Sequence, residues 1–313
     1  MRPFRFLAEA VEVVDGKVLA EKARRAESLG FDVLVFSDHL INQLAPIPAM
    51  ATVAAATDKL RIGTFVFNND LRHPAVLAQD LATLDVLSGG RLEIGIGAGW
   101  NKPEYDRAGL PFEPVGTRVG RLEEAVAVLK GLFGGGPFSF AGEHYTITEM
   151  DGQPKPTQQP HPPFMIGGGG RRLLTLAGRE ADIVSLAPRI GANVRGDPTS
   201  ITLAATAEKI GWVREAAGDR FSDIELNVYP SMSPVIVTDH ARAEVRKLRD
   251  RLRARGDPEV SEDELLESPH IFIGSIDGLV KKLQRLREQL GISSIMLGDI
   301  DELAPVVERL AGT

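Results

Sequence analysis

An Asp-His pair directly follows a short apolar run in the first part of the chain. Asp38 and His39 come after residues 33–36, whose apolar and β-branched side chains indicate a buried strand. A histidine in this position can act as an acid or base near neutral pH, and a neighbouring carboxylate can orient its ring. We therefore name His39 and Asp38 as candidate catalytic residues. A loop hydrogen bond or a helix cap is the alternative for the same pair.

Glycines alternate at the end of a second apolar run. Gly95, Gly97 and Gly99 follow or lie within residues 92–96 and precede Trp100. Glycines at the end of a strand let a flat ring or a phosphate approach the backbone closely. The spacing does not match the G-x-G-x-x-G dinucleotide pattern, and a tight turn without a ligand remains the alternative.

A more specific glycine signal lies farther along the chain. Four consecutive glycines at 167–170 are followed by Arg171, a second arginine and an apparent helix. The free N–H groups and the positive dipole end at a helix N-terminus bind anions. We therefore predict that Gly168, Gly169, Gly170 and Arg171 hold a phosphate group. Because we expect this loop to face solvent, replacing Gly169 by aspartate should weaken phosphate binding more than it lowers stability.

A third apolar run, residues 62–67, ends in Asn68 and Asn69. Bulky side chains in this run can back an aromatic ring, while Asn68 can hydrogen-bond the polar edge of that ring. Packing inside the fold is the alternative, and it is the preferred interpretation for Phe67.

These residues lie at the ends of regularly repeated strand patterns. The apolar, β-branched runs that predict strands are Phe4–Leu7, Val33–Phe36, Ile62–Phe67, Leu92–Ile96, Phe164–Ile166, Asp182–Leu186, Ile224–Tyr229 and Ser294–Leu297. Amphipathic helical stretches between them include Lys17–Leu29, Pro74–Leu87, Gly120–Phe133, Leu173–Gly178, Ile201–Ala217 and Ala241–Arg255. Eight alternating strand and helix units favour an α/β fold of the (β/α)₈ TIM-barrel class, with residues 1–313 as one domain. An open doubly wound sheet is the alternative.

Three segments interrupt this alternation and are rich in Gly, Pro and polar residues. They are Asn101–Val119, Gly134–Pro163 and Leu186–Thr199, and the middle one contains a possible hairpin at 138–147. Because they follow or precede strand ends, we expect them to form insertion loops over the C-terminal mouth of the barrel.

Composition narrows the range of partners. The chain has 313 residues, a formal net charge of −7 with interspersed signs, and no cysteine. We therefore expect a cytoplasmic protein that acts on small molecules, with no nucleic-acid partner, no membrane span and no thiolate chemistry. The histidines lack the clustering of a metal site, so no metal is expected.

Several motifs in order resemble the luciferase-like monooxygenase superfamily over nearly the whole chain. The matching segments are residues 36–39 (FSDH), 61–64 (RIGT), 73–79 (HPAVLAQ), 87–91 (LSGGR), 95–100 (GIGAGW), 162–170 (PPFMIGGGG) and 272–275 (FIGS). They are most similar to the branch that uses coenzyme F420, a deazaflavin. The resemblance implies hydride transfer between C5 of that ring and an organic substrate. A flavin mononucleotide (FMN) monooxygenase and a flavin-binding protein without activity are the alternatives.

The resemblance also implies roles for particular residues. Asp38 and His39 would lie by the ring, with Asp38 orienting His39, and a non-proline cis peptide would join Phe65 and Val66 behind the ring. The residues expected to bind the cofactor are Thr64, Phe65, Val66, Asn68, Gly97, Ala98, Gly99, Trp100, Gly168, Gly169, Gly170 and Arg171. Trp100 departs from deazaflavin-dependent sugar-phosphate dehydrogenases, which carry a glutamate acid there, so their substrate is not carried over. Related barrels pair through early helices, and residues 46–56 are apolar on more than one face, so we also expect a homodimer.

Overall fold

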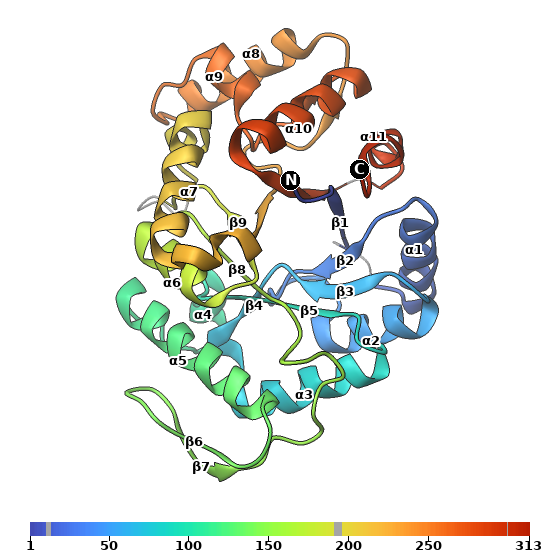
Figure 1. Ribbon diagram of the computed structural model, residues 1–313. Helices are drawn as coiled ribbons and strands as arrows, with labels where there is room; N and C mark the ends of the chain where they lie inside the picture. Colours follow the sequence, from blue (N-terminus) through green and yellow to red (C-terminus); the bar gives the residue numbers. More distant parts are fainter. Residues whose placement is uncertain (11–13, 191–195, 299) are drawn as a thin grey trace. The chain divides into compact units, whose positions relative to one another are not determined.

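The computed structural model describes residues 1–10, 14–190, 196–298 and 300–313. Its chain divides into two compact units. Figure 1 colours the chain along the sequence, from blue at the N-terminus to red at the C-terminus. Unit 1 comprises Met1–Glu9, Ser28–Asp32 and Gly167–Thr313, and unit 2 comprises Ala10–Glu27 and Val33–Ile166. The prediction of a single domain over the whole chain stays a prediction.

Unit 2 is built on parallel strands whose carboxyl ends carry the first candidate residues. Strand β2 (Val33–Phe36) pairs with β3 (Arg61–Thr64), β3 with β5 (Leu92–Gly97), and β5 with the start of β8 (Phe164–Gly168). Strands β2 and β5 are buried along their whole length, as their apolar runs predict. The helices of this unit are α1 (Gly16–Ser28), α2 (Pro46–Ala56), α3 (Pro74–Leu87), α4 (Lys102–Ala108) and α5 (Val115–Phe133), with a 3₁₀ turn at Asn69–Leu71.

The strand predicted at residues 62–67 is interrupted. It divides into β3 and a short β4 (Phe67–Asn68) that also pairs with β5, and the peptide bond between Phe65 and Val66 is cis. The N–H of Phe65 donates to the carbonyl of Phe36 at the end of β2, 2.8 Å away. The cis peptide implied by the family resemblance is therefore confirmed.

One predicted loop is wrong and one hairpin is confirmed. The composition of residues 101–119 predicts an insertion loop, yet they contain α4 and the beginning of α5. Pro103 suits the first turn of α4 and Gly109 closes it with φ = 69°, so this Pro- and Gly-rich composition marks the two ends of a helix. The hairpin expected near residues 138–147 is formed by antiparallel β6 (Phe138–Ala141) and β7 (Thr146–Met150).

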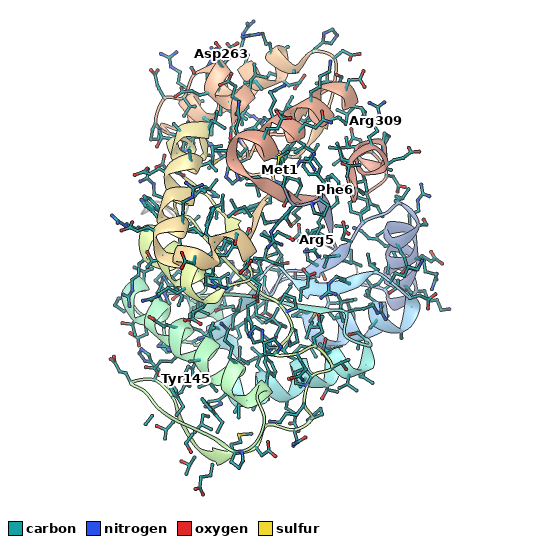
Figure 2. All side chains as sticks on the ribbon, in the orientation of Figure 1. Met1, Arg5, Phe6, Tyr145, Asp263 and Arg309 are labelled. Atoms are coloured by element: carbon teal, nitrogen blue, oxygen red, sulfur yellow. The ribbon has the colours of Figure 1, made fainter. Side chains whose placement is uncertain are left out.

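Unit 1 has its own parallel strands, in the order β1 (Arg5–Glu9), β13 (Ile292–Leu297), β10 (Glu225–Val228) and β9 (Ile183–Leu186). Buried polar side chains cross three of them: Ser185 donates to Asn227 at 2.8 Å, and Asn227 donates to Ser294 at 3.1 Å. Arg5, labelled in Figure 2, reaches Glu225 at 2.9 Å. The helices of unit 1 include α6 (Arg171–Glu180), α7 (Leu203–Ala217), α10 (Ile276–Leu290) and α11 (Ala304–Leu310), with 3₁₀ turns at Pro198–Ile201 and Gly218–Asp223.

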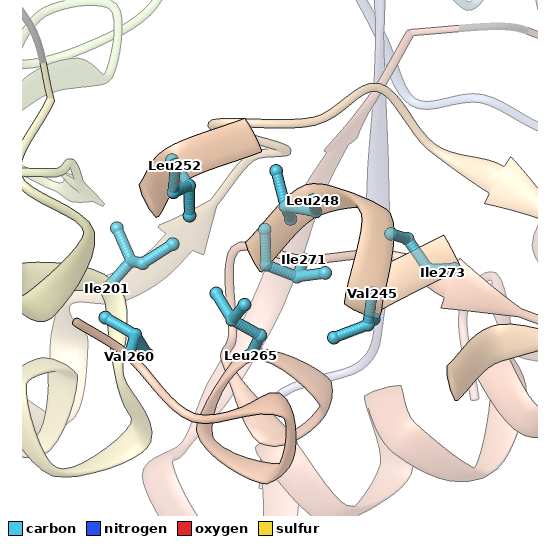
Figure 3. Packing of buried hydrophobic residues seen from close by; sticks show 8 residues of the cluster. All are labelled: Ile201, Val245, Leu248, Leu252, Val260, Leu265, Ile271 and Ile273. Carbon is cyan, nitrogen blue, oxygen red and sulfur yellow. The ribbon is translucent and has the colours of Figure 1, made fainter. Parts of the chain in front are cut away.

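An apolar cluster in unit 1 lies around α8 (Ala241–Ala254), α9 (Glu262–Glu267) and the paired strands β11 (Ile236–Val237) and β12 (Ile273–Gly274). Figure 3 shows its buried members, which are Ile201, Val245, Leu248, Leu252, Val260, Leu265, Ile271 and Ile273. None of the helices within the described ranges is both long enough and apolar enough to cross a membrane.

Candidate functional site

Asp38 is held at the end of β2 by an arginine. Its carboxylate accepts from both Nη atoms of Arg72 at 2.6 and 3.1 Å, and from the backbone N–H of Asn68 at 3.0 Å. Asp38 is only 5% exposed. The expectation that Asp38 orients His39 is therefore wrong, because both carboxylate oxygens accept from Arg72 and one of them also from Asn68.

His39 has a different carboxylate partner. Its Nδ1 lies 2.9 Å from Oε2 of Glu104, which is buried on α4. Since an ionised carboxylate only accepts, Nδ1 carries the hydrogen of this bond. The second oxygen of Glu104, Oε1, is buried and has no hydrogen-bond partner among the described residues. The His39 ring also meets the Trp100 ring edge-on, with centroids 5.6 Å apart.

Glu104 was missed by the sequence reasoning. Because the sequence predicts a loop at residues 101–119, it gives no direction for any side chain there. A signal was present: Pro103 followed by Glu104 and Tyr105 fits the first turn of a helix, where acidic residues are favoured.

A network of side-chain hydrogen bonds holds α4 against the residues that follow β4. The hydroxyl of Tyr105 lies 2.9 Å from both Asn68 Oδ1 and Asp70 Oδ2, which share its one hydrogen, and Asp70 also pairs with Arg121 at 2.7 Å. Burial, together with the nearby Asp70 carboxylate, raises the pKa of Tyr105 to about 12. A side chain at Gly99, where φ is +71°, would come within 2.0 Å of that hydroxyl, so glycine is required there by packing as well as by backbone conformation.

The other residues predicted to bind the ring differ in how far their side chains are exposed to solvent. Phe65 and Val66 are half-buried, and Trp100 is 48% exposed. Thr64 is buried and donates to the carbonyl of Gly95 at 2.7 Å, while Gly97 and Ala98 are also buried. These positions leave Phe65, Val66 and Trp100 as the apolar surfaces that a flat ring can reach. Their contact with a cofactor stays a prediction.

Asn68 retains a donor for such a ring. Its side-chain oxygen accepts from the Tyr105 hydroxyl and from the N–H of Asp70. No described residue accepts a hydrogen bond from its Nδ2. The half-buried apolar surface, the Asn68 amide and the orphaned Oε1 of Glu104 together fit a partly polar aromatic cofactor ring.

The glycine segment 167–170 lies in unit 1, although β8, which leads into it, begins in unit 2. The loop that these glycines form is shorter than expected. Gly167 and Gly168 end β8, so only Gly169 and Gly170 form the turn before α6. The N-cap of α6, Gly170, makes no side-chain bond to the first turn, and its N–H groups remain suited to an anion. Binding of a phosphate at this turn is untested and stays a prediction.

Gly169 is not the solvent-facing residue that the sequence suggested. It is buried, and a Cβ there would lie 2.3 Å from the backbone oxygen of Pro188. A Cβ at Gly170 would meet nothing within 4 Å. The expectation that Gly169→Asp would spare stability is therefore wrong, because the glycine allows close approach of the segment after β9.

Two of the cations near this turn are already engaged. Arg171, predicted to bind phosphate, pairs with Glu215 on α7 at 3.1 Å, and both side chains are exposed. Lys209 of α7 is buried and donates to the carbonyls of Ala187 at 2.5 Å and Ser200 at 2.7 Å. Lys209 thus connects residues at the two ends of the expected insertion loop 186–199. Residues 191–195 of this loop lie outside the described residues.

Comparison with known proteins defines the fold and then the family. A coenzyme F420-dependent tetrahydromethanopterin reductase from Methanopyrus kandleri superposes with a TM-score of 0.77 over 99% of this chain and 98% of its own, at 21% identity. The chain therefore has the (β/α)₈ barrel fold, as predicted. The family model described as luciferase-like monooxygenase matches residues 8–294. The chain belongs to this family.

Curated relatives share parts of the sequence. An FMNH₂-dependent dimethylsulfone monooxygenase of Pseudomonas putida is 34% identical over 45% of this chain and 39% of its own length. An F420-dependent glucose-6-phosphate dehydrogenase of Microbacterium testaceum is 34% identical over 55% of this chain and 51% of its own. The matched part thus spans about half the length of these relatives or less.

Proposed function

We propose that the chain is an oxidoreductase that binds coenzyme F420 and moves a hydride between the deazaflavin and an organic substrate. The observation that carries this proposal is the 2.9 Å His39–Glu104 pair at the end of β2. The pair combines a proton-holding imidazole with the accessible apolar surface of Trp100, Phe65 and Val66. Relatives and solved structures that use F420 support the choice of cofactor.

The residues of the chain divide the work between orientation and proton handling. When bound, a deazaflavin supplies hydride transfer at C5, and its ring carbon disfavours reaction with oxygen. The Nδ1–H of His39 is committed to Glu104, and Nε2 hydrogen-bonds with none of the described residues. Nε2 is therefore the atom that would exchange a proton with the substrate, while Glu104 stabilises the charged imidazole.

Glu104 also offers a carboxylate in place of the glutamate that is missing at Trp100. The carboxylate that the sugar-phosphate dehydrogenases carry at that position is supplied here one turn later, from α4, and it acts through His39. Asp38 has a positioning role instead: with Arg72 it holds the backbone N–H of Asn68 and thereby the polar edge of the ring site.

Titration of the purified protein with F420 and with FMN tests the choice of cofactor. We expect F420 to bind at least about tenfold more tightly, which corresponds to about 1.4 kcal/mol. The variant His39→Ala should still bind F420 but lose turnover with an aldehyde and enone panel. Tighter binding of FMN would overturn the proposal.

An FMN-dependent monooxygenase is the second candidate, supported by the dimethylsulfone monooxygenase relative. It predicts oxygen consumption with reduced FMN and a suitable organic substrate. A flavin-binding protein without activity is the third, and it predicts tight cofactor binding with no turnover of any reducible compound in the panel.

We also propose that the chain acts in the cytoplasm as a homodimer that pairs through α2 and α3. These helices contact each other, and their exposed positions are uncharged, including Pro48, Thr52, Val76 and Leu87. Val76 is 58% and Leu87 67% exposed, an arrangement typical of a covered surface. Light scattering that gives the 33.8 kDa monomer mass at micromolar concentration would refute the dimer.

A further inference from the structure

Asn68 ends β4 and is held from two sides. Its backbone N–H donates to the carboxylate of Asp38 at 3.0 Å, and Asp38 is itself bound by Arg72. Its side-chain oxygen, Oδ1, lies 2.9 Å from the hydroxyl of Tyr105 and accepts from the backbone N–H of Asp70 at 3.1 Å. Both the backbone and the side chain of Asn68 are therefore fixed by the protein.

The direction of the Asn68 amide follows from these partners. A backbone N–H only donates, so the atom that faces the N–H of Asp70 must be the amide oxygen. The flipped amide would place two donors against each other. The amide nitrogen, Nδ2, is thus directed away from Asp70, and no described residue accepts a hydrogen bond from it. Asn68 is half-buried and Nδ2 is not among the buried atoms that lack a partner, so this donor is accessible to a ligand.

Tyr105 is the buried member of this arrangement. It is 1% exposed, and its ring meets that of Phe112 edge-on, with centroids 4.9 Å apart. Its hydroxyl lies between Asn68 Oδ1 and the carboxylate of Asp70, which pairs with Arg121 at 2.7 Å. Burial raises the pKa of Tyr105 to about 12, so the hydroxyl keeps its hydrogen at neutral pH. The Asn68 oxygen therefore faces a donor whose position is set by packing.

A donor fixed in this way selects an acceptor on the cofactor ring. The oxidised rings of a flavin and a deazaflavin both carry carbonyl oxygens on their pyrimidine half, and carbonyl oxygens accept hydrogen bonds. Atom N5 of a flavin is replaced by carbon in a deazaflavin, so N5 is an acceptor in only one of the two rings. The pyrimidine half therefore carries the acceptors that both rings have in common. A donor that is already oriented before the ligand arrives loses less conformational entropy on binding.

We propose that Nδ2 of Asn68 donates to a carbonyl oxygen on the pyrimidine half of the cofactor ring, and that Tyr105 is a positioning residue that holds the amide in this direction. The inference rests on the proposed cofactor-binding function of this site. It makes ring affinity depend on a buried tyrosine that acts only through Asn68.

Titration calorimetry of the full chain with FMN and with 5-deaza-FMN tests the inference, because these ligands share one phosphate tail and differ only at ring position 5. We expect Tyr105→Phe to weaken both ligands by about twofold to tenfold, the range for one lost neutral hydrogen bond. Tyr145→Phe is the matched control (Figure 2). The Tyr145 hydroxyl lies 3.3 Å from Nδ2 of Asn69, the neighbouring residue, and its loss should leave both affinities unchanged.

A double-mutant cycle separates positioning from a general structural role. Asn68→Ala should weaken both ligands by about tenfold. In this background Tyr105→Phe should cause no further loss, because no amide remains for the hydroxyl to hold. In ¹H–¹⁵N NMR of the wild-type chain, the side-chain amide signal that is absent from Asn68→Ala should shift when either ligand is added. All variants are compared at a temperature at which circular dichroism shows them to be folded.

The outcomes separate the inference from the proposed function. Unchanged affinity in Asn68→Ala or Tyr105→Phe, an equal loss for Tyr105→Phe in both backgrounds, or an effect on FMN but not on 5-deaza-FMN overturns the inference, even if F420 binds tightly. If both probes show the expected coupling but F420 binds more weakly than FMN, the inference stands and the choice of F420 is overturned. If the wild-type chain binds none of the three ligands, both are overturned.

Discussion

The two units hold their buried charged groups in different ways. In unit 2, carboxylates meet cationic or imidazole side chains: Asp38 pairs with Arg72, Asp70 with Arg121 and Glu104 with His39. Unit 1 also contains such a pair, Arg5 with Glu225, but two of its buried lysines donate to backbone carbonyls. Lys209 binds Ala187 and Ser200, and Lys282 of α10 binds Leu266 at 2.7 Å and Ile271 at 2.5 Å.

This difference separates two structural tasks. Side-chain pairs fix charged groups relative to one another, which chemistry on a substrate requires. A lysine between two carbonyls fixes the backbone of a loop and leaves its side chains unconstrained. We therefore expect substitutions in these side-chain pairs to expose uncompensated charge, and substitutions of these two lysines to release loops.

The largest effect should come from Asp38→Ala in unit 2. It leaves Arg72 without its carboxylate in a site where the arginine side chain is only 24% exposed, and should cost about 3 kcal/mol of unfolding free energy. Urea denaturation measures this cost. Asp263→Ala breaks the exposed pair with Arg242 and should change stability by less than about 1 kcal/mol. Equal losses in the two variants would contradict the contrast between buried and exposed pairs.

Catalysis should respond to Glu104→Gln more than stability does. The amide preserves shape but cannot stabilise a protonated His39, so we expect turnover to fall by about tenfold to a hundredfold. Cofactor affinity and melting temperature should change little. Asp106→Asn, at an exposed position of the same helix, is the matched control. Unchanged turnover in Glu104→Gln would remove the carboxylate from the mechanism.

Two adjacent glycines of unit 1 should behave differently. Gly169→Ala places a Cβ against the Pro188 carbonyl and should destabilise the chain by about 1–3 kcal/mol. Gly170→Ala enters open space and should alter stability by less than about 0.5 kcal/mol. Thermal unfolding of both variants compares them. Gly170→Asp then tests phosphate binding, since its charge should weaken F420 affinity by about tenfold with little loss of stability.

A further effect, spread over several pH units, is a pH dependence from the buried lysines. Burial lowers the pKa of Lys209 to about 8 and that of Lys282 to about 7, from 10.5. Above about pH 8, up to 10.5, the unfolded chain therefore holds more protons, and stability should rise with pH by up to about 1.4 kcal/mol per pH unit for each lysine. Unfolding measured from about pH 8 to about pH 9.5 avoids titration of tyrosines.

Lys209→Met should reduce the slope of unfolding free energy against pH by the contribution of one lysine, up to about 1.4 kcal/mol per pH unit. The exposed Lys247→Met should leave it unchanged. An identical slope in wild-type protein and Lys209→Met would show that Lys209 keeps an ordinary pKa despite its burial.

Much of the architecture was present in the sequence. The predicted runs at 33–36, 92–96 and 164–166 all lie in strands, and the helix at 74–87 has the predicted bounds. These elements are long or strongly apolar, so their local pattern agrees with their place in the fold. The ordered motifs also identified the family, and through it the cis peptide at Phe65–Val66. Motifs of this kind consist of residue types at fixed spacings, which can be read directly from the sequence.

The partners of the site residues were decided only by tertiary structure. Adjacent in sequence, Asp38 and His39 suggested a pair, yet successive residues after a strand point in different directions. Asp38 turns to Arg72, 34 residues away, and His39 to Glu104, 65 residues away. Likewise Gly169 is needed because Pro188 lies against it. Such contacts depend on which strand ends lie next to one another in the folded chain. A local pattern of residues does not specify the distance between segments that are far apart in the sequence.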